Sequence, residues 1–570
     1  AIGRLALYAQ DPASAVDMYN TAVGYLTGTS VTTGRLNTLI GGLSADSLTV
    51  GERNTAVGAV ALGADTQGSR SVAVGQSALA VQNFTSATDT YNTAVGYDAG
   101  KSVSTGTSNT LIGGLAGDAQ TTASNNTAVG YASLGTNTTG AGNVAVGRES
   151  LFNNTTASNN TAVGLNSLYT NTTGANNVAV GKDALIASTT AGNNTAVGYD
   201  CLQANTTGAG NVAVGKSALE ANTTASENTA VGMNALGANT TGDLNVAIGG
   251  NALQANVAGD RAVAIGYQAL AVQNPSGNVD TYNVAIGLNS QSNTTTGINN
   301  VAVGGASLAA NTTASNNTAV GSAALGANTT GTQNTALGAT TLDANTTGDN
   351  NTALGWSALT ASTTGSGNTA VGSIALFVNT TGASNVAVGQ EAMRYNTTAS
   401  NNTAVGFQAL NANTTGTNNV AVGKDSLDSN TTGNNNVAVG MDALQANISG
   451  NNNVAVGTQA LINNTGASNT AVGNDTLAAN TSGADNVAVG RSCLDANTTA
   501  SSCTAVGASA LGSNTTGALN TAVGSSAMAN NTTGAYNVAM GFAALQLNTT
   551  ANDNTAFGYA ALNATTTGAK

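Results

Sequence analysis

Few residues of this chain could carry out catalysis, and none of them recurs in an arrangement that would let them act together. The chain has 570 residues, 7% of them charged, and no histidine. A Ser/His/Asp or Cys/His arrangement is therefore excluded, and no acidic pair recurs with the regularity of a catalytic site. We expect a protein that is not an enzyme and that needs no cofactor.

The three cysteines do not form a metal site. Cys201, Cys493 and Cys503 are odd in number, lack metal-ligand spacing, and have no histidine to complete a zinc site. Cys201 and Cys493 stand where related segments of the chain carry Ala, and Cys503 stands where they carry Asn. We interpret all three as tolerated substitutions.

Asparagine offers a different chemistry, because Asn-Thr-Thr recurs along the chain as an N-glycosylation sequon. Examples begin at Asn137, Asn154 and Asn171. Asn and Thr are also common turn residues, so turn chemistry alone accounts for the same motif. Both interpretations stay open at this point.

One position varies in chemistry while the residues around it stay constant. It is the residue directly after the glycine of each recurring Ala-Val-Gly segment. It carries aromatic, basic and other residues: Tyr131, Arg148, Lys182, Tyr199, Lys216, Met233, Trp356, Gln390, Phe407, Lys424, Arg491 and Tyr559. Only a solvent-exposed position tolerates such a mixture. The row either contacts a glycan or receptor or is simply a solvated edge.

The charge balance limits the partners. The chain has 13 basic and 26 acidic residues, a formal charge of −13, and no cluster of Lys or Arg. Because nucleic-acid binding needs concentrated positive charge, we expect no nucleic-acid partner. No run of about 20 apolar residues occurs, so we expect no membrane span either.

The elements that position these residues come from a repeat of 17 residues. The glycine closing each Asn-[Thr/Val]-Ala-Val-Gly segment recurs from Gly3 to Gly558, with 28 intervals of 17 residues, three of 21 and one of 16, which makes 33 coils. We call it the marker glycine. The consensus is N-[T/V]-A-V-G-x-x-A-L-x-A-N-T-T-G-x-x. A fixed period of this kind predicts a stacked repeat architecture.

Each coil is expected to hold two short strands. The Thr/Val-Ala-Val triplet alternates and is partly β-branched, so it predicts a strand whose two faces are both apolar, followed by a turn at Gly. The stretch x-x-A-L-x-A is expected to form a second strand with Leu pointing inward. The fold class is therefore all-β, a parallel β-solenoid of about 33 coils.

Stacking would align equivalent residues into ladders. We expect an interior column of Leu134, Leu151 and Leu168, a second interior column of Val129, Val146 and Val163, and an asparagine ladder of Asn143, Asn160 and Asn177. Stacked Asn amides bond along the axis as they do in cross-β structures.

The first part of the chain is the less regular one. Residues 1–123 form divergent coils that include two longer lateral loops, and residues 124–570 form the regular shaft. A third long loop occupies residues 274–283, and all three loops end in Tyr-Asn. We treat both parts as one continuous repeat domain.

The pattern Asn317-Thr318-Ala319-Val320-Gly321 through Asn328-Thr329-Thr330-Gly331 resembles two related kinds of protein. One is the head of trimeric autotransporter adhesins, a left-handed parallel β-roll. The other is the repeat shaft of tail-fibre proteins. The resemblance covers nearly all the chain and implies a left-handed homotrimer located outside the cell, on a cell surface or on a virion.

The residues support self-association independently. If Val fills the interior, the row Ala128, Ala145, Ala162 and Ala179 would form a long apolar stripe on the surface, and such stripes mark interfaces. We therefore expect this row to be the trimer interface; the alternative is that Ala merely tolerates exposure.

The expected function is the shaft of an extracellular adhesive fibre or phage tail fibre, which holds a tip or anchor at a distance. A cell-surface glycan or receptor would then be bound by a tip outside this chain. A self-assembling surface filament is the alternative. An ice-binding solenoid is a weaker one, since adjacent Thr-Thr in a strand would face opposite sides and give no flat hydroxyl grid.

Overall fold

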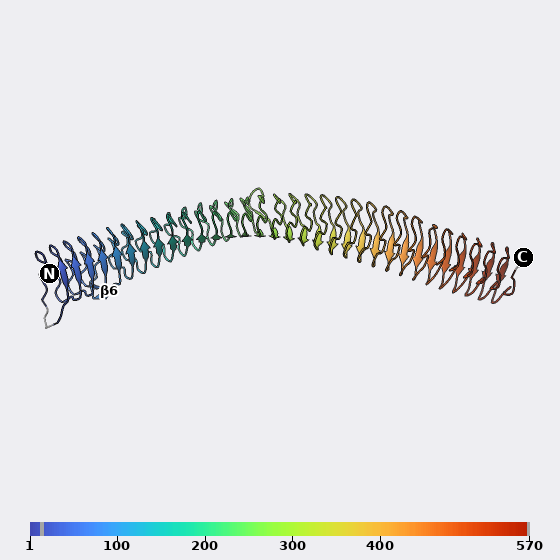
Figure 1. Cartoon of the computed structure of the whole chain (residues 1–570), viewed down its shortest axis with the longest axis horizontal. Coiled ribbons are helices and arrows are strands. Elements are labelled where there is room, and N and C mark those ends of the chain that lie inside the picture. The colour runs from blue at the N-terminus through green and yellow to red at the C-terminus, as the bar shows by residue number, and fades with distance from the viewer. Residues whose placement is uncertain (12–15, 567–570) are drawn as a thin grey trace. The chain divides into compact units, whose positions relative to one another are not determined.

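The computed structural model describes residues 1–11 and 16–566, and these residues contain strands and turns but no helix. The chain divides into two compact units, Ala1–Ala285 and Ile286–Lys570. This division does not follow the change from divergent to regular coils near residue 123. Figure 1 draws the strands as arrows stacked side by side within each unit, blue at the start of the first and red at the end of the second.

Each coil after the first contributes one three-residue strand, the first coil contributes only a bridge between Ile2 and Val23, and a few coils add a two-residue strand. In the first unit the strands are β1 (Thr21–Val23), β2 (Thr38–Ile40), β3 (Thr55–Val57), β4 (Gly68–Ser69), β5 (Val72–Val74), β6 (Thr88–Asp89), β7 (Thr93–Val95), β8 (Thr110–Ile112), β9 (Thr127–Val129), β10 (Val144–Val146), β11 (Thr161–Val163), β12 (Val178–Val180), β13 (Thr195–Val197), β14 (Val212–Val214), β15 (Thr229–Val231), β16 (Val246–Ile248), β17 (Gly259–Asp260), β18 (Val263–Ile265) and β19 (Val279–Asp280). The boundary between the units falls within β20 (Val284–Ile286).

The second unit has one strand per coil throughout its described residues. Its strands are β21 (Val301–Val303), β22 (Thr318–Val320), β23 (Thr335–Leu337), β24 (Thr352–Leu354), β25 (Thr369–Val371), β26 (Val386–Val388), β27 (Thr403–Val405), β28 (Val420–Val422), β29 (Val437–Val439), β30 (Val454–Val456), β31 (Thr470–Val472), β32 (Val487–Val489), β33 (Thr504–Val506), β34 (Thr521–Val523), β35 (Val538–Met540) and β36 (Thr555–Phe557).

Neighbouring strands pair in parallel and in register with the repeat. In β10 and β11, Ala145 lies opposite Ala162 and Val146 opposite Val163, so each residue meets its equivalent 17 positions on. The backbone continues the ladder on both sides of the strand: Val144 N donates to Asn160 O at 2.8 Å, and Gly147 N donates to Val129 O at 2.8 Å. The expected all-β solenoid with a 17-residue coil is confirmed.

The interior of most coils is lined by Leu from one wall and by the strand Ala from the other. Leu134, Leu151 and Leu168 are fully buried, as expected, and so are Ala145 and Ala162. These residues belong to one continuous apolar core in the first unit, and their counterparts form another in the second. The stacking of coils therefore creates the core, because no single coil could enclose these side chains.

The expected assignment of the two strand faces is wrong. Ala128, Ala145, Ala162 and Ala179 are all fully buried within their own chain, so they cannot be the surface through which chains meet. Val129, Val146 and Val163 stack as a column, but on the outside of the strand, where they are half-buried. The physical reason is space: the Leu side chains from the facing wall leave room for a methyl group only.

Two coils show this complementarity directly. Leu39 and Leu111 replace the strand Ala and are fully buried. The positions that face them carry Gly28 and Gly100, where a Cβ would lie only 2.6 Å from Leu39 Cδ1 and 2.5 Å from Leu111 Cδ1. A large residue on one wall is thus matched by glycine on the other, as close packing requires.

The expected second strand is also wrong, because the x-x-A-L-x-A stretch is turn backbone in every coil that the structure describes. In the coil after β12, Asp183 and Leu185 have φ values of 56° and 53°, in the left-handed region. Asp, Asn and Ser are common at the first of these positions, and Asn and Asp tolerate this region best. The Leu conformation is held by its burial in the core.

The long loops of the first unit add short strands beside the main stack. β4 pairs with β6, and β17 pairs with β19, each in parallel. After each loop, the next strand of the main stack pairs with residues 21 positions earlier in the chain instead of 17. Thr93, for example, pairs with Val72. Residues 12–15 of the first long loop lie outside the described residues.

Candidate interaction surface

The asparagine that precedes most strands of the main stack binds its coil to both neighbours. Asn160 N donates to Asn143 Oδ1 at 3.0 Å, and Asn160 Nδ2 donates to Gly174 O at 2.9 Å. Asn177 N in turn donates to Asn160 Oδ1 at 2.9 Å. Asn143, Asn160 and Asn177 are fully buried. Each amide is therefore fully engaged along the stack and is not available to a partner.

The Asn-Thr-Thr motif forms a second buried ladder. Asn154 Nδ2 donates to Asn137 Oδ1 at 2.8 Å and to Ala157 O at 2.9 Å, and Asn171 repeats both contacts one coil later. Asn137, Asn154 and Asn171 have no exposed surface. A glycan on Nδ2 would have no room and would remove both hydrogen bonds, so glycosylation of these sites is incompatible with the folded coil.

The cysteines occupy buried positions of the same framework. Burial raises the pKa of the Cys201 and Cys493 thiols to about 12, which makes them unreactive at neutral pH. Burial also raises the pKa of Cys503. Its Sγ contacts Gly517 O at 3.3 Å, in place of the Asn amide of other coils, and its backbone N still donates to Asn486 Oδ1 at 3.0 Å.

The outer face of the strands is an apolar surface of β-branched side chains. Each strand places its first and third residues outside, usually Thr or Val and then Val, and these are half-buried to exposed. In the second unit, Val487 and Val489 of the same strand are 39% and 37% exposed, and Leu354 is 42% exposed. This stripe of outward residues, which we call the outer face, continues along every strand of the main stack in each unit.

The variable position after the marker glycine forms a column of exposed side chains. Arg148 lies over the ring of Tyr131, with Cζ 5.9 Å from the centroid, and Lys182 Nζ lies 5.1 Å from the centroid of Tyr199. Trp356 is 61% exposed. Such exposed cation–π contacts contribute about 0.5–1 kcal/mol each. The column is accessible, but its members do not converge on a common centre.

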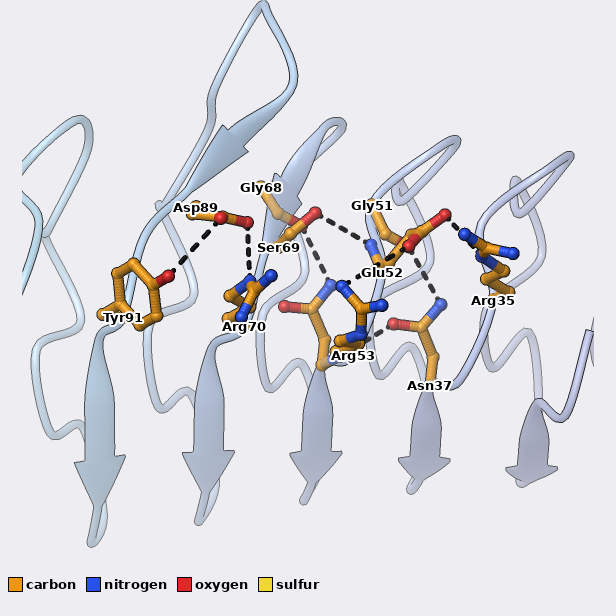
Figure 2. Close-up of polar contacts among 11 residues, drawn as sticks. Arg35, Asn37, Gly51, Glu52, Arg53, Gly68, Ser69, Arg70, Asp89 and Tyr91 are labelled. Atoms are coloured by element: carbon orange, nitrogen blue, oxygen red, sulfur yellow. Dashed lines mark hydrogen bonds and ion pairs between the residues drawn. The ribbon is translucent and has the colours of Figure 1, made fainter.

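The first coils also carry a network of charged side chains, which is separate from the variable column (Figure 2). Arg35 Nε donates to Glu52 Oε1 at 2.8 Å, and Ser69 Oγ accepts a hydrogen bond from Glu52 N at 3.0 Å. Arg70 Nε lies 2.9 Å from Asp89 Oδ1, and its Cζ lies 5.5 Å from the centroid of Tyr91. These pairs are partly exposed, so each contributes little to stability.

The contact among Arg70, Asp89 and Tyr91 fastens a long loop to the preceding coil. The third long loop repeats it: Arg261 forms an ion pair with Asp280 and lies 5.9 Å from the ring of Tyr282. This contact was not predicted from the sequence, although the motif that supplies its Asp and Tyr, Asp-x-Tyr-Asn, is present in all three long loops.

Beneath the second long loop, Asp65 is a buried carboxylate. It accepts hydrogen bonds from Gln82 Nε2 at 2.7 Å, Gly68 N at 3.0 Å and Phe84 N at 3.2 Å, and it has no exposed surface. Burial raises its pKa above the ordinary value of 3.8, because these hydrogen bonds do not fully replace water around the charge. Asn256 takes the same place beneath the third loop.

Asp65 should therefore make stability fall as pH rises. A raised pKa in the folded state means that the folded chain keeps this proton at pH values where the unfolded chain has lost it, so stability drops between pH 3.8 and the raised value. Relative to the native chain, Asp65→Asn should gain stability across this window, by about 1.4 kcal/mol per unit of raised pKa. Urea unfolding at a series of pH values measures it.

The reciprocal substitution is the matched control. Asn256→Asp places a carboxylate at a position that is also fully buried, and it should introduce the same loss of stability with rising pH. If the stability difference between Asp65→Asn and the native chain were independent of pH, the raised pKa of Asp65 would be refuted.

The part of the chain that the structure describes offers no apolar helix of membrane-spanning length. Comparison of the chain with protein-family models and with curated proteins finds no match in either case.

Proposed function

We propose that this protein is a structural, non-catalytic shaft of an extracellular fibre, of the adhesive or tail-fibre kind, in which copies of the chain associate along their outer faces as a homotrimer. In this proposal a tip outside the chain binds the cell-surface glycan or receptor. The observation that carries the proposal is the outer face, a stripe of half-buried to exposed Val and Thr side chains that continues along every strand of the main stack in each unit.

The area of the outer face in one unit is close to one partner's share of a standard interface. Three residues at about 3.3 Å each and a strand spacing of about 4.8 Å give roughly 48 Å² per strand, so 15 strands give roughly 700 Å² in one unit. A partner in a standard interface contributes about 800 Å². Each unit by itself therefore approaches the required area.

The chemistry of the outer face also favours burial. The Val columns are half-buried to exposed, and among the exposed members Val405 is 37% and Val472 36% exposed. Contiguous apolar patches of more than a few hundred Å² mark interaction sites in soluble proteins. The flatness of parallel β-branched columns suits packing against an identical copy.

The interior explains why such a chain would serve as a shaft. The Leu and Ala rows and the two Asn ladders bind each coil only to its neighbours, so stability and length both grow with coil number. Such a stack sets a fixed distance between whatever lies at its two ends. A self-assembling filament uses the same interior but makes its contacts end to end.

Substitution of the outer face should abolish association without unfolding the chain. Val163→Glu combined with Val180→Glu places like charges from neighbouring copies together at an interface, while each Glu stays half-exposed and solvated in the single chain. We expect the mass measured by light scattering to fall from that of a trimer to that of one chain of 55.1 kDa, with unchanged circular dichroism.

The matched control adds the same two charges elsewhere. Gln254→Glu with Gln445→Glu should leave the mass unchanged. A native chain that is already monomeric at micromolar concentration would overturn the homotrimer, and polymers of indefinite length would instead favour the filament.

A further inference from the structure

A column of side chains on the wall opposite the strands contains a pairing of acid with glycine. This column is the fifth position after each marker glycine, and we call it the far-wall column. It contains five glycines, and each has an acidic residue in the same column of an adjacent coil. The pairs are Asp46 with Gly63, Asp118 with Gly135, Glu220 with Gly237, Asp343 with Gly326, and Asp495 with Gly512.

At each of two of these pairs, three oxygen atoms surround the space left by the missing side chain. The position that a Cβ would occupy on Gly512 lies 3.3 Å from Asp495 Oδ1, 3.4 Å from Ser509 O and 3.7 Å from Ser492 O. An open cavity of about 460 Å³ lies here, with Asp495, Ser509 and Gly512 in its lining.

The second pair reproduces the arrangement with the acid on the opposite side. The Cβ position of Gly326 lies 2.7 Å from Asp343 Oδ1, 3.2 Å from Ala323 O and 3.7 Å from Ala306 O. In both places the two carbonyls belong to the glycine's own coil and to the preceding coil. The same three-oxygen set therefore arises from two independent stretches of sequence.

The preceding-coil carbonyl in this column can accept a further ligand, while the own-coil carbonyls Ala323 O and Ser509 O already accept from Gly326 N at 3.2 Å and Gly512 N at 3.3 Å and keep a second lone pair. At two positions where the far-wall residue is a donor instead of glycine, it bonds to the carbonyl of the preceding coil: Thr360 Oγ1 donates to Thr340 O at 2.8 Å, and Asn411 Nδ2 donates to Glu391 O at 2.9 Å. At Gly326 and Gly512 no side chain fills this role, and the corresponding carbonyl oxygens, of Ala306 and Ser492, each lie 3.7 Å from the Cβ position.

The carboxylates lack a cation of their own. Neither Asp343 nor Asp495 forms an ion pair with any described residue. Partial burial raises the pKa of both carboxyl groups, which agrees with a charge that is poorly hydrated and not neutralised by a neighbour.

We propose that the notches at Asp343 with Gly326 and at Asp495 with Gly512 each bind a calcium ion through one carboxylate oxygen and two main-chain carbonyl oxygens. Ca²⁺ prefers oxygen ligands, accepts carboxylates and carbonyls together, and fills its remaining positions with water. One carboxylate per site predicts weak binding, at about 10⁻⁴–10⁻³ M, the range of extracellular calcium modules.

The other three acid and glycine pairs lack the complete set of three oxygens or have a side chain in the space beside the glycine. Val60 Cγ1 lies 3.1 Å from the Cβ position of Gly63, and the ring of Phe152 covers that of Gly135 at 2.7 Å. At Gly237 one carbonyl, Asn234 O, is the only oxygen among the three nearest atoms. We therefore assign calcium to the two complete notches.

Equilibrium dialysis of the full chain against radioactive calcium at about 5 mM free Ca²⁺ tests the assignment. Gly326→Ala with Gly512→Ala fills both notches and leaves both carboxylates in place. Neither glycine has a left-handed φ, and Ala271 and Ala529 already occupy this column, so the variant should fold normally. We expect it to bind close to two fewer ions per chain, and Asp343→Asn with Asp495→Asn to lose the same number.

Asp428→Asn is the matched control, because Asp428 stands in the same column between Asn411 and Gln445 and not beside glycine. It should bind as many ions as the native chain. Equal binding by the native chain and the Gly→Ala variant, or an equal loss in Asp428→Asn, would overturn the proposal.

Discussion

Replacing Leu236 with Asp should unfold the coils around it, whereas the same change at Met233 should be nearly neutral. Leu236 has no exposed surface and belongs to the apolar core of the first unit, while Met233, three residues earlier, is 51% exposed. A carboxylate at position 236 would be buried without a partner and would lose the Leu packing, at a cost of about 4 kcal/mol or more.

Thermal unfolding followed by circular dichroism would measure the difference, and hydrogen exchange would locate it. In a stacked repeat each coil contacts only its neighbours, so loss of protection should centre on the coils next to residue 236. Similar melting curves for Leu236→Asp and Met233→Asp would mean that the inward and outward faces of this wall are wrongly assigned.

Two adjacent glycines should respond in opposite ways to alanine. Gly304 is a marker glycine with φ of 140°, and a Cβ there would lie 2.6 Å from the carbonyl carbon of Gly321 in the next coil. Gly305 has nothing within 4 Å of its Cβ position and no left-handed φ. Gly304→Ala should therefore destabilise the second unit by about 3 kcal/mol or more, since both strain and a backbone collision must be relieved.

Gly305→Ala should leave stability within about 0.5 kcal/mol of the native chain. Urea unfolding of the two variants provides the comparison, and their closeness in sequence removes differences in surroundings. If both substitutions were tolerated equally, the close approach of successive marker glycines would not exist in solution.

Much of the fold could be predicted from the repeat because equivalent residues must meet when identical coils stack. The 17-residue spacing by itself places Asn143 next to Asn160 and Leu134 next to Leu151, whatever the detailed path of the chain between them. The glycine after each strand identifies the turn. The position of Leu in the interior also follows, because Leu recurs in nearly every coil and is larger than the Val and Ala that recur with it.

The wall that carries Leu could not be predicted in the same way. Its sequence, x-x-A-L-x-A, is compatible with a strand, and only the path of the closed coil imposes the left-handed backbone at positions such as Asp183 and Leu185. The acid and glycine pairs of the far-wall column are visible in the sequence once the coils are aligned. The two carbonyls that complete each notch belong to the backbone and leave no signal in the residue types.

The sequence by itself determined the period, the parallel register, the turn at each marker glycine and the ladders of Leu and Asn. Only the tertiary structure decided which face of Thr/Val-Ala-Val lies inside. Alternation along a strand assigns residues to two faces, but it does not say which face points into the core when both faces are apolar. The space that the opposing Leu side chains leave inside the coil decides which face is buried. It is wide enough for Ala145, whereas Val146 remains outside. The same choice moves the surface available for self-association from the Ala row to the Val columns.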